Sequence, residues 1–149
     1  MAPSNLNRVT VLGAGVLGGQ IAWHSAFKGK TVVVYDPFPE AIAKARVAHE
    51  MYARIYAAEL GASDADLEAT RSRVTYSDQL EPAVANADLV IEAVPEVPEI
   101  KTGVYQQMAA LLPPHTIVAT NSSTLLPRDF AAATGRPEQY CALHFANLI

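Results

Sequence analysis

Residues 9–23 read VTVLGAGVLGGQIAW, a predicted buried strand that runs through a cluster of glycines into a predicted helix. Gly13, Gly15 and Gly18 stand in G-x-G-x-x-G order between the strand and the helix, which is the context that this spacing needs. Gly13 permits a tight turn, Gly15 lets a ligand approach the backbone, and Gly18 lets the helix pack closely on the strand. We therefore expect the loop to bind the diphosphate of a dinucleotide at the helix start. The alternative is a turn with incidental glycines.

An acid after the second predicted strand supports the same interpretation. Asp36 ends the β-branched run TVVVYD (31–36), 18 residues after Gly18. In the dinucleotide-binding pattern, an acid about 20 residues past the loop accepts hydrogen bonds from the adenosine ribose. A carboxylate there repels a 2′-phosphate, and no arginine follows in DPFPE, so the pattern favours NAD over NADP. Asp36 is otherwise a turn residue before Pro37.

Short apolar and β-branched runs alternate with longer helical runs along the chain. The predicted strands cover residues 8–13, 31–36, 74–76, 87–94, 115–120 and 140–146. The predicted helices cover 16–28, 39–60, a short segment after a capping box at Ser63 and Asp66, 98–112, and a short segment after Pro127. This alternation predicts an α/β fold: a doubly wound, Rossmann-type, mostly parallel sheet with strand order 3-2-1-4-5-6. We expect the long helical pair between strands two and three to project as a helical hairpin.

The size and charge of the chain argue against several classes of protein. Its 149 residues correspond to about one domain, taken here as 1–149. A net charge of −4 without a basic stripe argues against nucleic acid as a partner. No apolar run reaches the ~18 residues of a membrane span, and the N-terminus does not resemble a signal peptide. One cysteine, Cys141, excludes an internal disulfide, so we expect a cytoplasmic protein.

Polar residues gather where the predicted strands end. Strand four runs into Glu92–Glu96, strand five into TNSST (120–124) and strand six into HFAN (144–147). In a parallel sheet these ends share one edge with the glycine loop, and ligands bind there. His144 would face the nicotinamide half of a dinucleotide, where an imidazole can take the proton of a substrate hydroxyl. The alternative for His144 is a hydrogen-bonded histidine inside the core.

The other polar candidates also have two explanations each. The hydroxyls of residues 122–124 either bind the substrate oxygen or form a turn before a short helix. Asn147 either orients a ligand or ends the strand. Lys101 is either a solvated helix residue or reaches Glu96 or the cofactor. The histidines have no metal-binding spacing, so we expect no metal site.

Several segments occur together and in one order: VTVLGAGVLGGQIA (9–22), VVVYD (32–36), ADLVIEAVPE (87–96), ATNSSTL (119–125) and ALHFAN (142–147). In this combination the chain resembles the NAD-binding half of the L-3-hydroxyacyl-CoA dehydrogenase family, over essentially its whole length. It is most similar to the diketoreductase-like branch, with which it shares ATNSSTLLP and LHFAN. The resemblance implies an oxidoreductase that interconverts a 3-hydroxyacyl substrate, as a CoA thioester or an ester, and its 3-keto form.

The resemblance also implies roles for individual residues. His144 matches the catalytic base, and Ser123 matches the serine that hydrogen-bonds the reacting oxygen of the substrate. The residues implied to bind NAD are Gly13, Gly15, Val16, Leu17, Gly18, Asp36, Ala93, Glu96, Lys101, Asn121 and Asn147.

Two departures from the family bear on activity. The usual HFFNP is HFANL here, with Ala146 and Leu148 as the changed residues, which loosens the pocket wall beside the base and leaves a free 3-hydroxy or 3,5-dioxo ester as an alternative to the acyl-CoA substrate. Relatives also carry a glutamate beyond the histidine and an all-helical second domain that forms a homodimer. Without them we expect this chain to bind NAD weakly and to turn over little. The alternatives are a regulatory NAD-binding module without chemistry and a Rossmann module for FAD.

Overall fold

The computed structural model describes residues 5–146, which form a six-stranded sheet in the order β3-β2-β1-β4-β5-β6. The strands are β1 (Arg8–Leu12), β2 (Thr31–Tyr35), β3 (Val74–Ser77), β4 (Leu89–Glu92), β5 (Ile117–Thr120) and β6 (Tyr140–Ala142). All pairings in this sheet are parallel, so the predicted strand order and Rossmann-type fold are confirmed. The chain order reverses between β1 and β4, which is where such sheets bind their ligands.

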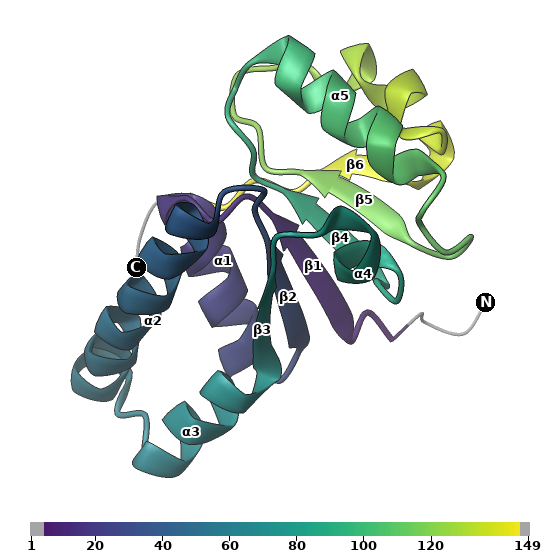
Figure 1. Ribbon diagram of the computed structural model, residues 1–149. Coiled ribbons are helices and arrows are strands. Elements are labelled where there is room, and N and C mark those ends of the chain that lie inside the picture. The colour runs from purple at the N-terminus through teal and green to yellow at the C-terminus, as the bar shows by residue number, and fades with distance from the viewer. Residues whose placement is uncertain (1–4, 147–149) are drawn as a thin grey trace.

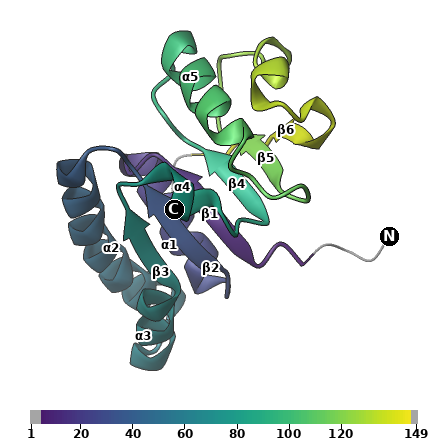
Figure 2. The ribbon, with the colours of Figure 1, turned by 45° about the vertical axis from the view of Figure 1, so that its right-hand side comes forward.

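Helices cover both faces of the sheet (Figures 1 and 2). They are α1 (Val16–Phe27), α2 (Pro39–Leu60), α3 (Asp64–Arg73), α4 (Leu80–Val84) and α5 (Pro98–Ala109), followed by the 3₁₀ turns η1 (Pro127–Asp129), η2 (Ala131–Thr134) and η3 (Pro137–Gln139). Val9 and Val11 of β1 pack with residues of α1 and α2 on one face. Leu12 packs with residues of α4 and α5 on the other face, as the two-residue period of a strand requires.

The helical pair α2–α3 extends beyond the edge strand β3, as predicted (Figure 1). Its turn has clear local causes. Gly61 has a φ of 65°, the left-handed conformation that ends many helices, and Ser63 and Asp66 form the predicted capping box. Near the turn of the pair, the buried ring of Trp23 from α1 packs edge-on against Tyr56 from α2. This aromatic contact anchors the hairpin to the body of the domain.

Several predicted boundaries are wrong. The last strand ends at Ala142 rather than at residue 146, because β5 ends at Thr120 and offers no further backbone ladder. The segment after Pro127 forms 3₁₀ turns instead of an α-helix, and the fourth strand is shorter than predicted at both ends. Helix α4 was not predicted, because five residues are too few to show a helical period.

At the amino edge of the sheet, Asp88 joins the start of β1 to the segments before β4 and β5. Its carboxylate accepts hydrogen bonds from the backbone N–H groups of Asn7 (3.1 Å) and Arg8 (2.8 Å). The Arg8 guanidinium and the His115 ring each approach it to 3.0 Å. The hydrogen bond from Arg8 is the main reason why the pKa of Asp88 is far below its usual range. Because the Arg8 side chain is 52% exposed, solvent screens its ion pair with Asp88. The hydrogen bonds from the two backbone N–H groups therefore contribute more to the stability of the fold than the ion pair does.

We expect Asp88→Ala to lower the free energy of unfolding by about 1–3 kcal/mol, because backbone donors lose their acceptor. The pKa of Asp88 is lower in the folded protein than in the unfolded chain. The stabilisation is therefore complete above about pH 4 and is lost as the pH falls further, toward the lowered pKa. Urea unfolding at neutral and acid pH measures both effects, with Asp129→Ala as an exposed control. A variant as stable as the wild type at neutral pH contradicts this account.

Candidate active site at the carboxyl edge of the sheet

At the carboxyl edge of the sheet, the hydrogen bonding between neighbouring segments continues one residue beyond the ends of the strands. Backbone N–H groups donate across it at 2.8–3.2 Å, from Gly13 to Tyr35, Asp36 to Ser77, Ala93 to Leu12, Asn121 to Glu92, and Leu143 to Thr120. As a result, the glycine loop, Asp36 and the segments after β4, β5 and β6 all leave the sheet at the same edge. The structure thus brings together candidates that lie more than a hundred residues apart in the sequence.

Two of the three motif glycines are required by packing inside the protein. Gly13 has a φ of 104°, and a Cβ there would lie 2.5 Å from the carbonyl oxygen of Ala93. A Cβ on Gly18 would lie 2.0 Å from the carbonyl oxygen of Gly13. Gly15 differs, because a Cβ there would meet no atom within 4 Å. The missing side chain of Gly15 therefore keeps the space in front of the loop open.

The start of α1 has the properties of an anion site. Gly15 is its N-cap residue, no side chain caps the helix, and its first turn holds no acid. The first N–H groups of the helix, including those of Val16 and Leu17, have no partner within the helix and carry the positive end of its dipole. Together with the open space at Gly15, this arrangement fits the diphosphate of a dinucleotide.

Asp36 lies beside this loop and is largely buried. Its carboxylate accepts hydrogen bonds from the backbone N–H groups of Ala14 (2.9 Å) and Phe38 (3.0 Å). It lines a pocket of about 470 Å³ whose other walls come from the loops after β2 and β4 and from α5. These walls include Val94, Ile100 and other apolar side chains. The pocket fits an adenosine, with the base between apolar walls and the ribose hydroxyls at the carboxylate.

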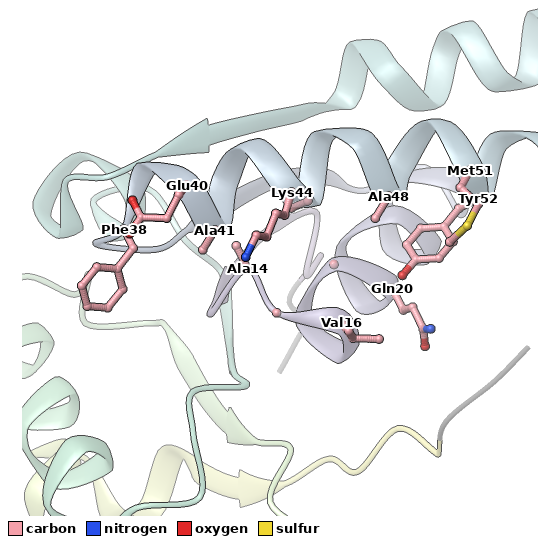
Figure 3. Close-up of a pocket in the computed structure, with 13 residues that line it drawn as sticks. Ala14, Val16, Gln20, Phe38, Glu40, Ala41, Lys44, Ala48, Met51 and Tyr52 are labelled. Atoms are coloured by element: carbon pink, nitrogen blue, oxygen red, sulfur yellow. The ribbon is translucent and has the colours of Figure 1, made fainter.

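A second hollow of about 600 Å³ lies between α1 and α2, next to the glycine loop (Figure 3). Val16 and Gln20 line it from α1, and Lys44 and Met51 line it from α2. The side chains that line the hollow are mostly apolar. One end of the hollow lies at Gly15, where the diphosphate would bind. The hollow can therefore hold an apolar part of a ligand that also reaches the loop.

Sequence reasoning placed Glu92 at the end of the fourth strand but gave it no role; in the structure it ends β4 and is completely buried. Its two oxygens accept hydrogen bonds from the Lys101 ammonium at 2.6 and 2.7 Å. One oxygen also accepts from the hydroxyls of Tyr105 and Thr120, each at 2.7 Å. Burial, and then the charge of Glu92, raises the pKa of Tyr105, so that its hydroxyl remains a donor. An acid within an otherwise apolar strand is the sequence signal that would have found this cluster.

Lys101 is not a solvated helix residue, because its side chain is fully buried. Its ammonium also reaches Glu96, at 3.4 Å, which agrees with the other explanation. Glu96 accepts hydrogen bonds from the hydroxyls of Ser122 and Thr124. Burial opposes ionisation of Glu96, but these hydrogen bonds and the charge of Lys101 lower its pKa.

The loop after β5 exposes Ser123 between two hydroxyls that are already engaged. Ser122 and Thr124 both donate to Glu96, and the Ser122 hydroxyl also accepts the N–H of Leu125. The turn explanation therefore fits these two residues. The Ser123 hydroxyl has no hydrogen-bond partner within residues 5–146. Among these hydroxyls, that of Ser123 is the one available to a ligand.

His144 follows β6 and is exposed, so the alternative of a core histidine is wrong. Its Nδ1 lies 3.0 Å from the carbonyl oxygen of Asn121, whose side-chain oxygen accepts the N–H of Phe145 at 2.7 Å. Asn121 is buried at the end of β5 and so holds the histidine segment beside the Ser123 loop. When Nδ1 donates to this carbonyl, Nε2 keeps the lone pair that a base needs. Asn147 lies outside the described residues.

The described part of the chain offers acids, hydroxyls and an imidazole at this edge, but no metal-binding cluster. No three or more His, Cys, Asp or Glu side chains come together there in a way that could hold a metal ion. None of the helices in residues 5–146 combines the length and the apolar character needed to cross a membrane.

Known proteins match this chain over nearly all of its length. Residues 8–149 match the family model "3-hydroxyacyl-CoA dehydrogenase, NAD binding domain". The chain is 36% identical over 143 residues to the "Probable 3-hydroxybutyryl-CoA dehydrogenase" of Bacillus subtilis (strain 168), covering 95% of this chain and 49% of that protein. It is 35% identical over 150 residues to the "Fatty acid oxidation complex subunit alpha" of Pseudomonas savastanoi pv. phaseolicola, covering 96% and 20%.

A solved structure shows the same fold at higher identity. It is described as "Substrate-directed dual catalysis of dicarbonyl compounds by diketoreductase", and it matches with a TM-score of 0.93 and 47% identity. The match covers 97% of this chain and 51% of the diketoreductase. The chain therefore spans about half the length of two of these relatives and a fifth of the third.

Proposed function

Because this chain belongs to the family of NAD-binding domains of 3-hydroxyacyl-CoA dehydrogenases, we propose that it serves an oxidoreductase that interconverts a 3-hydroxyacyl substrate and its 3-keto form. Residues 1–149 would form the NAD-binding domain, which works with a second, helical domain. The greater length of the relatives supports this division. A purely regulatory NAD-binding module would not need the histidine and the free hydroxyl at the end of the sheet.

The contact between Asn121 and His144 carries the proposal. Asn121 holds Nδ1 of His144 through its carbonyl and directly precedes the loop that exposes Ser123. Because β5 and β6 pair in parallel, Ser123 and His144 leave adjacent strands at the same edge. They lie on the opposite side of the glycine loop from Asp36, which is the side that receives the nicotinamide half in this type of sheet.

This arrangement supports a proton transfer at the substrate hydroxyl. His144 would take the hydroxyl proton at Nε2, while its Nδ1–H stays bonded to Asn121 and keeps the ring oriented. Ser123 would donate a hydrogen bond to the same substrate oxygen. Bound NAD supplies the acceptor for the hydride that leaves the carbon. In the reverse direction His144 returns the proton to the keto oxygen.

The substrate class follows from the relatives and from the segment after His144. The Bacillus subtilis relative is named for a CoA thioester, and the diketoreductase for dicarbonyl compounds. Phe145 and Ala146 line a small, mostly apolar hollow together with Leu17 and Ile21 of α1. We propose a 3-keto compound, as a CoA thioester or a free ester, for a cytoplasmic protein that is a homodimer in its full-length form.

Calorimetric titration of the chain with NAD, NADP and FAD, and then with acetoacetyl-CoA, tests the proposal. We expect NAD to bind, and NADP to bind much less, because its 2′-phosphate meets Asp36. Acetoacetyl-CoA is titrated last, into the chain that is already saturated with NAD. Absence of NAD binding, or tighter binding of FAD, contradicts the proposed function.

Asp36→Ala should weaken NAD binding by about 10–100-fold, which corresponds to the loss of hydrogen bonds to a charged group. The variant loses the ribose acceptor and releases the N–H groups of Ala14 and Phe38. Asp36→Asn is the matched control, because it keeps the shape and one acceptor oxygen. We expect a smaller loss for NAD and less discrimination against NADP in this variant. Calorimetry measures both, and unchanged NAD affinity in Asp36→Ala refutes the assignment of the ribose site.

A further inference from the structure

The amide of Gln20 stands between two hollows that open on α1. Gln20 lines the larger hollow between α1 and α2, and it also lines the small hollow beside the segment that follows His144. Within residues 5–146, it is the residue that the two linings share. The side chain is half-buried, and Figure 3 shows its amide group directed away from the helix. A ligand that extends from one hollow to the other therefore passes this amide.

The small hollow begins one residue after the proposed base. Phe145 and Ala146 form one of its walls, and side chains of α1 form the other. Asn121 holds both the wall and the base, because its side-chain oxygen accepts the N–H of Phe145 and its carbonyl oxygen lies 3.0 Å from Nδ1 of His144. The volume of the hollow, about 220 Å³, lies below that of pockets for drug-sized ligands, so it suits a short acyl group.

The polar groups of the small hollow are uncharged. Its lining within residues 5–146 includes no lysine, arginine or acid, and its polar side chains are those of Gln20 and His24. Nδ1 of His24 lies 2.8 Å from the hydroxyl oxygen of Tyr56, and burial lowers the pKa of His24, so its ring is neutral at pH 7. The Gln20 amide has no hydrogen-bond partner within residues 5–146, and its NH₂ group can donate to a carbonyl oxygen.

We propose that Gln20 is a specificity-determining residue, which donates a hydrogen bond to the ester or thioester carbonyl of the 3-keto substrate. This inference rests on the proposed function and deepens it, because it assigns an esterified 3-keto acyl group to the site and discriminates against the free 3-keto acid. With the reacting oxygen at Ser123 and His144, the second carbonyl lies in the small hollow. The group esterified to it continues toward the larger, mostly apolar hollow. A free carboxylate in the same place would lose its hydration without meeting a cation.

The side-chain amide signals of Gln20 in NMR spectra report this contact directly. The chain is saturated with NAD and titrated with ethyl acetoacetate, acetoacetyl-CoA or acetoacetate. We expect both esterified ligands to shift the Gln20 signals until they saturate, and acetoacetate to shift them little. The signals of Gln106, which is exposed on α5, are the internal control and should stay in place. The lower Kd of the two esterified ligands decides between a thioester and an ester.

Two substitutions at this position separate recognition from a structural role. Gln20→Met removes the amide at similar volume and should weaken the binding of both esterified ligands by about 3–10-fold, the usual contribution of one neutral hydrogen bond. Its NAD affinity should not change, because the N–H groups proposed to hold the diphosphate precede Gln20 in the helix. Gln20→Lys places a cation in the hollow, so acetoacetate should then bind more tightly than ethyl acetoacetate. Gln106→Met is the matched control and should change neither affinity.

The outcomes distinguish this inference from the proposed function. If the wild-type chain binds no NAD, the proposed function itself fails, and the inference falls with it. If ethyl acetoacetate shifts the signals of Ser123 and His144 but not those of Gln20, the proposed function stands and the inference is wrong. The inference is equally wrong if the NAD-saturated chain binds neither esterified ligand, if acetoacetate binds as tightly as the ester, or if Gln20→Met binds both esterified ligands as the wild type does.

Discussion

His144→Ala is expected to lower turnover of a 3-keto substrate by about 10²–10⁴-fold, the usual contribution of a general base. NAD affinity should stay the same, because Nε2 faces the substrate oxygen in the proposed arrangement and not the cofactor. The variant keeps the other half of the contact, in which Asn121 accepts the N–H of Phe145. The segment after β6 should therefore hold its place without the imidazole.

The measurement needs a complete cleft. Because this chain aligns with 51% of the diketoreductase at 47% identity, the assay uses a fusion of this chain to the other half of that protein. Oxidation of NADH is then followed with acetoacetyl-CoA and with ethyl acetoacetate, which also decides between thioester and ester. His115→Ala is the control, since His115 lies at the amino edge of the sheet. An equal loss in both variants, or turnover by His144→Ala close to that of the wild type, removes His144 from the mechanism.

Gly18→Ala should both destabilise the domain and weaken NAD binding. The added Cβ would lie 2.0 Å from the carbonyl oxygen of Gly13, a backbone atom that cannot turn aside. Either α1 moves away from β1 or the loop deforms, which should cost about 1–3 kcal/mol of folding free energy. Both responses move the N–H groups that would hold the diphosphate, so NAD affinity falls as well.

Gly19→Ala is the matched control in the next position of the same helix. A Cβ there would lie 3.8 Å from Nε2 of His49, an ordinary contact. Because alanine stabilises a helix interior by roughly 0.5–1 kcal/mol relative to glycine, this variant should be as stable as the wild type or slightly more so. Thermal unfolding and NAD calorimetry on both variants test the difference. Equal behaviour of the two variants contradicts the packing role of Gly18.

Much of the fold was readable from local signals. The alternation of β-rich and helical runs, together with the glycines after β1, predicted the strand order that the structure shows. Gly61 and the pair Ser63–Asp66 marked the turn of the helical hairpin by their own chemistry. Such features are local, because a left-handed residue or a capping box needs only its immediate neighbours. Helix α4 was missed because five residues are too few to show a helical period, and the end of β6 was missed because it depends on where β5 ends.

The candidate site divides in the same way. Its cofactor half, from the glycine loop to Asp36, follows from spacing along the sequence, because one strand–loop–helix–strand unit builds it. Its reacting half depends on contacts between β4, α5, β5 and β6. Sequence reasoning left Lys101 with two explanations and gave Glu92 no buried partner, since charged residues are by default exposed. Whether a charged side chain is buried depends on which other segments of the folded chain pack over it.

The amino-acid sequence by itself determined the class of fold and the choice of NAD, and it predicted the edge of the sheet where we propose that the ligand binds, because glycine spacing, strand periodicity and a single acid act over short distances. Only the tertiary structure decided that Lys101 is buried against Glu92, that Glu96 binds the hydroxyls on both sides of Ser123, and that Asn121 holds His144. These contacts join residues from separate strands and helices. They arise because the parallel sheet aligns the carboxyl ends of its strands, which no local pattern in the chain can specify.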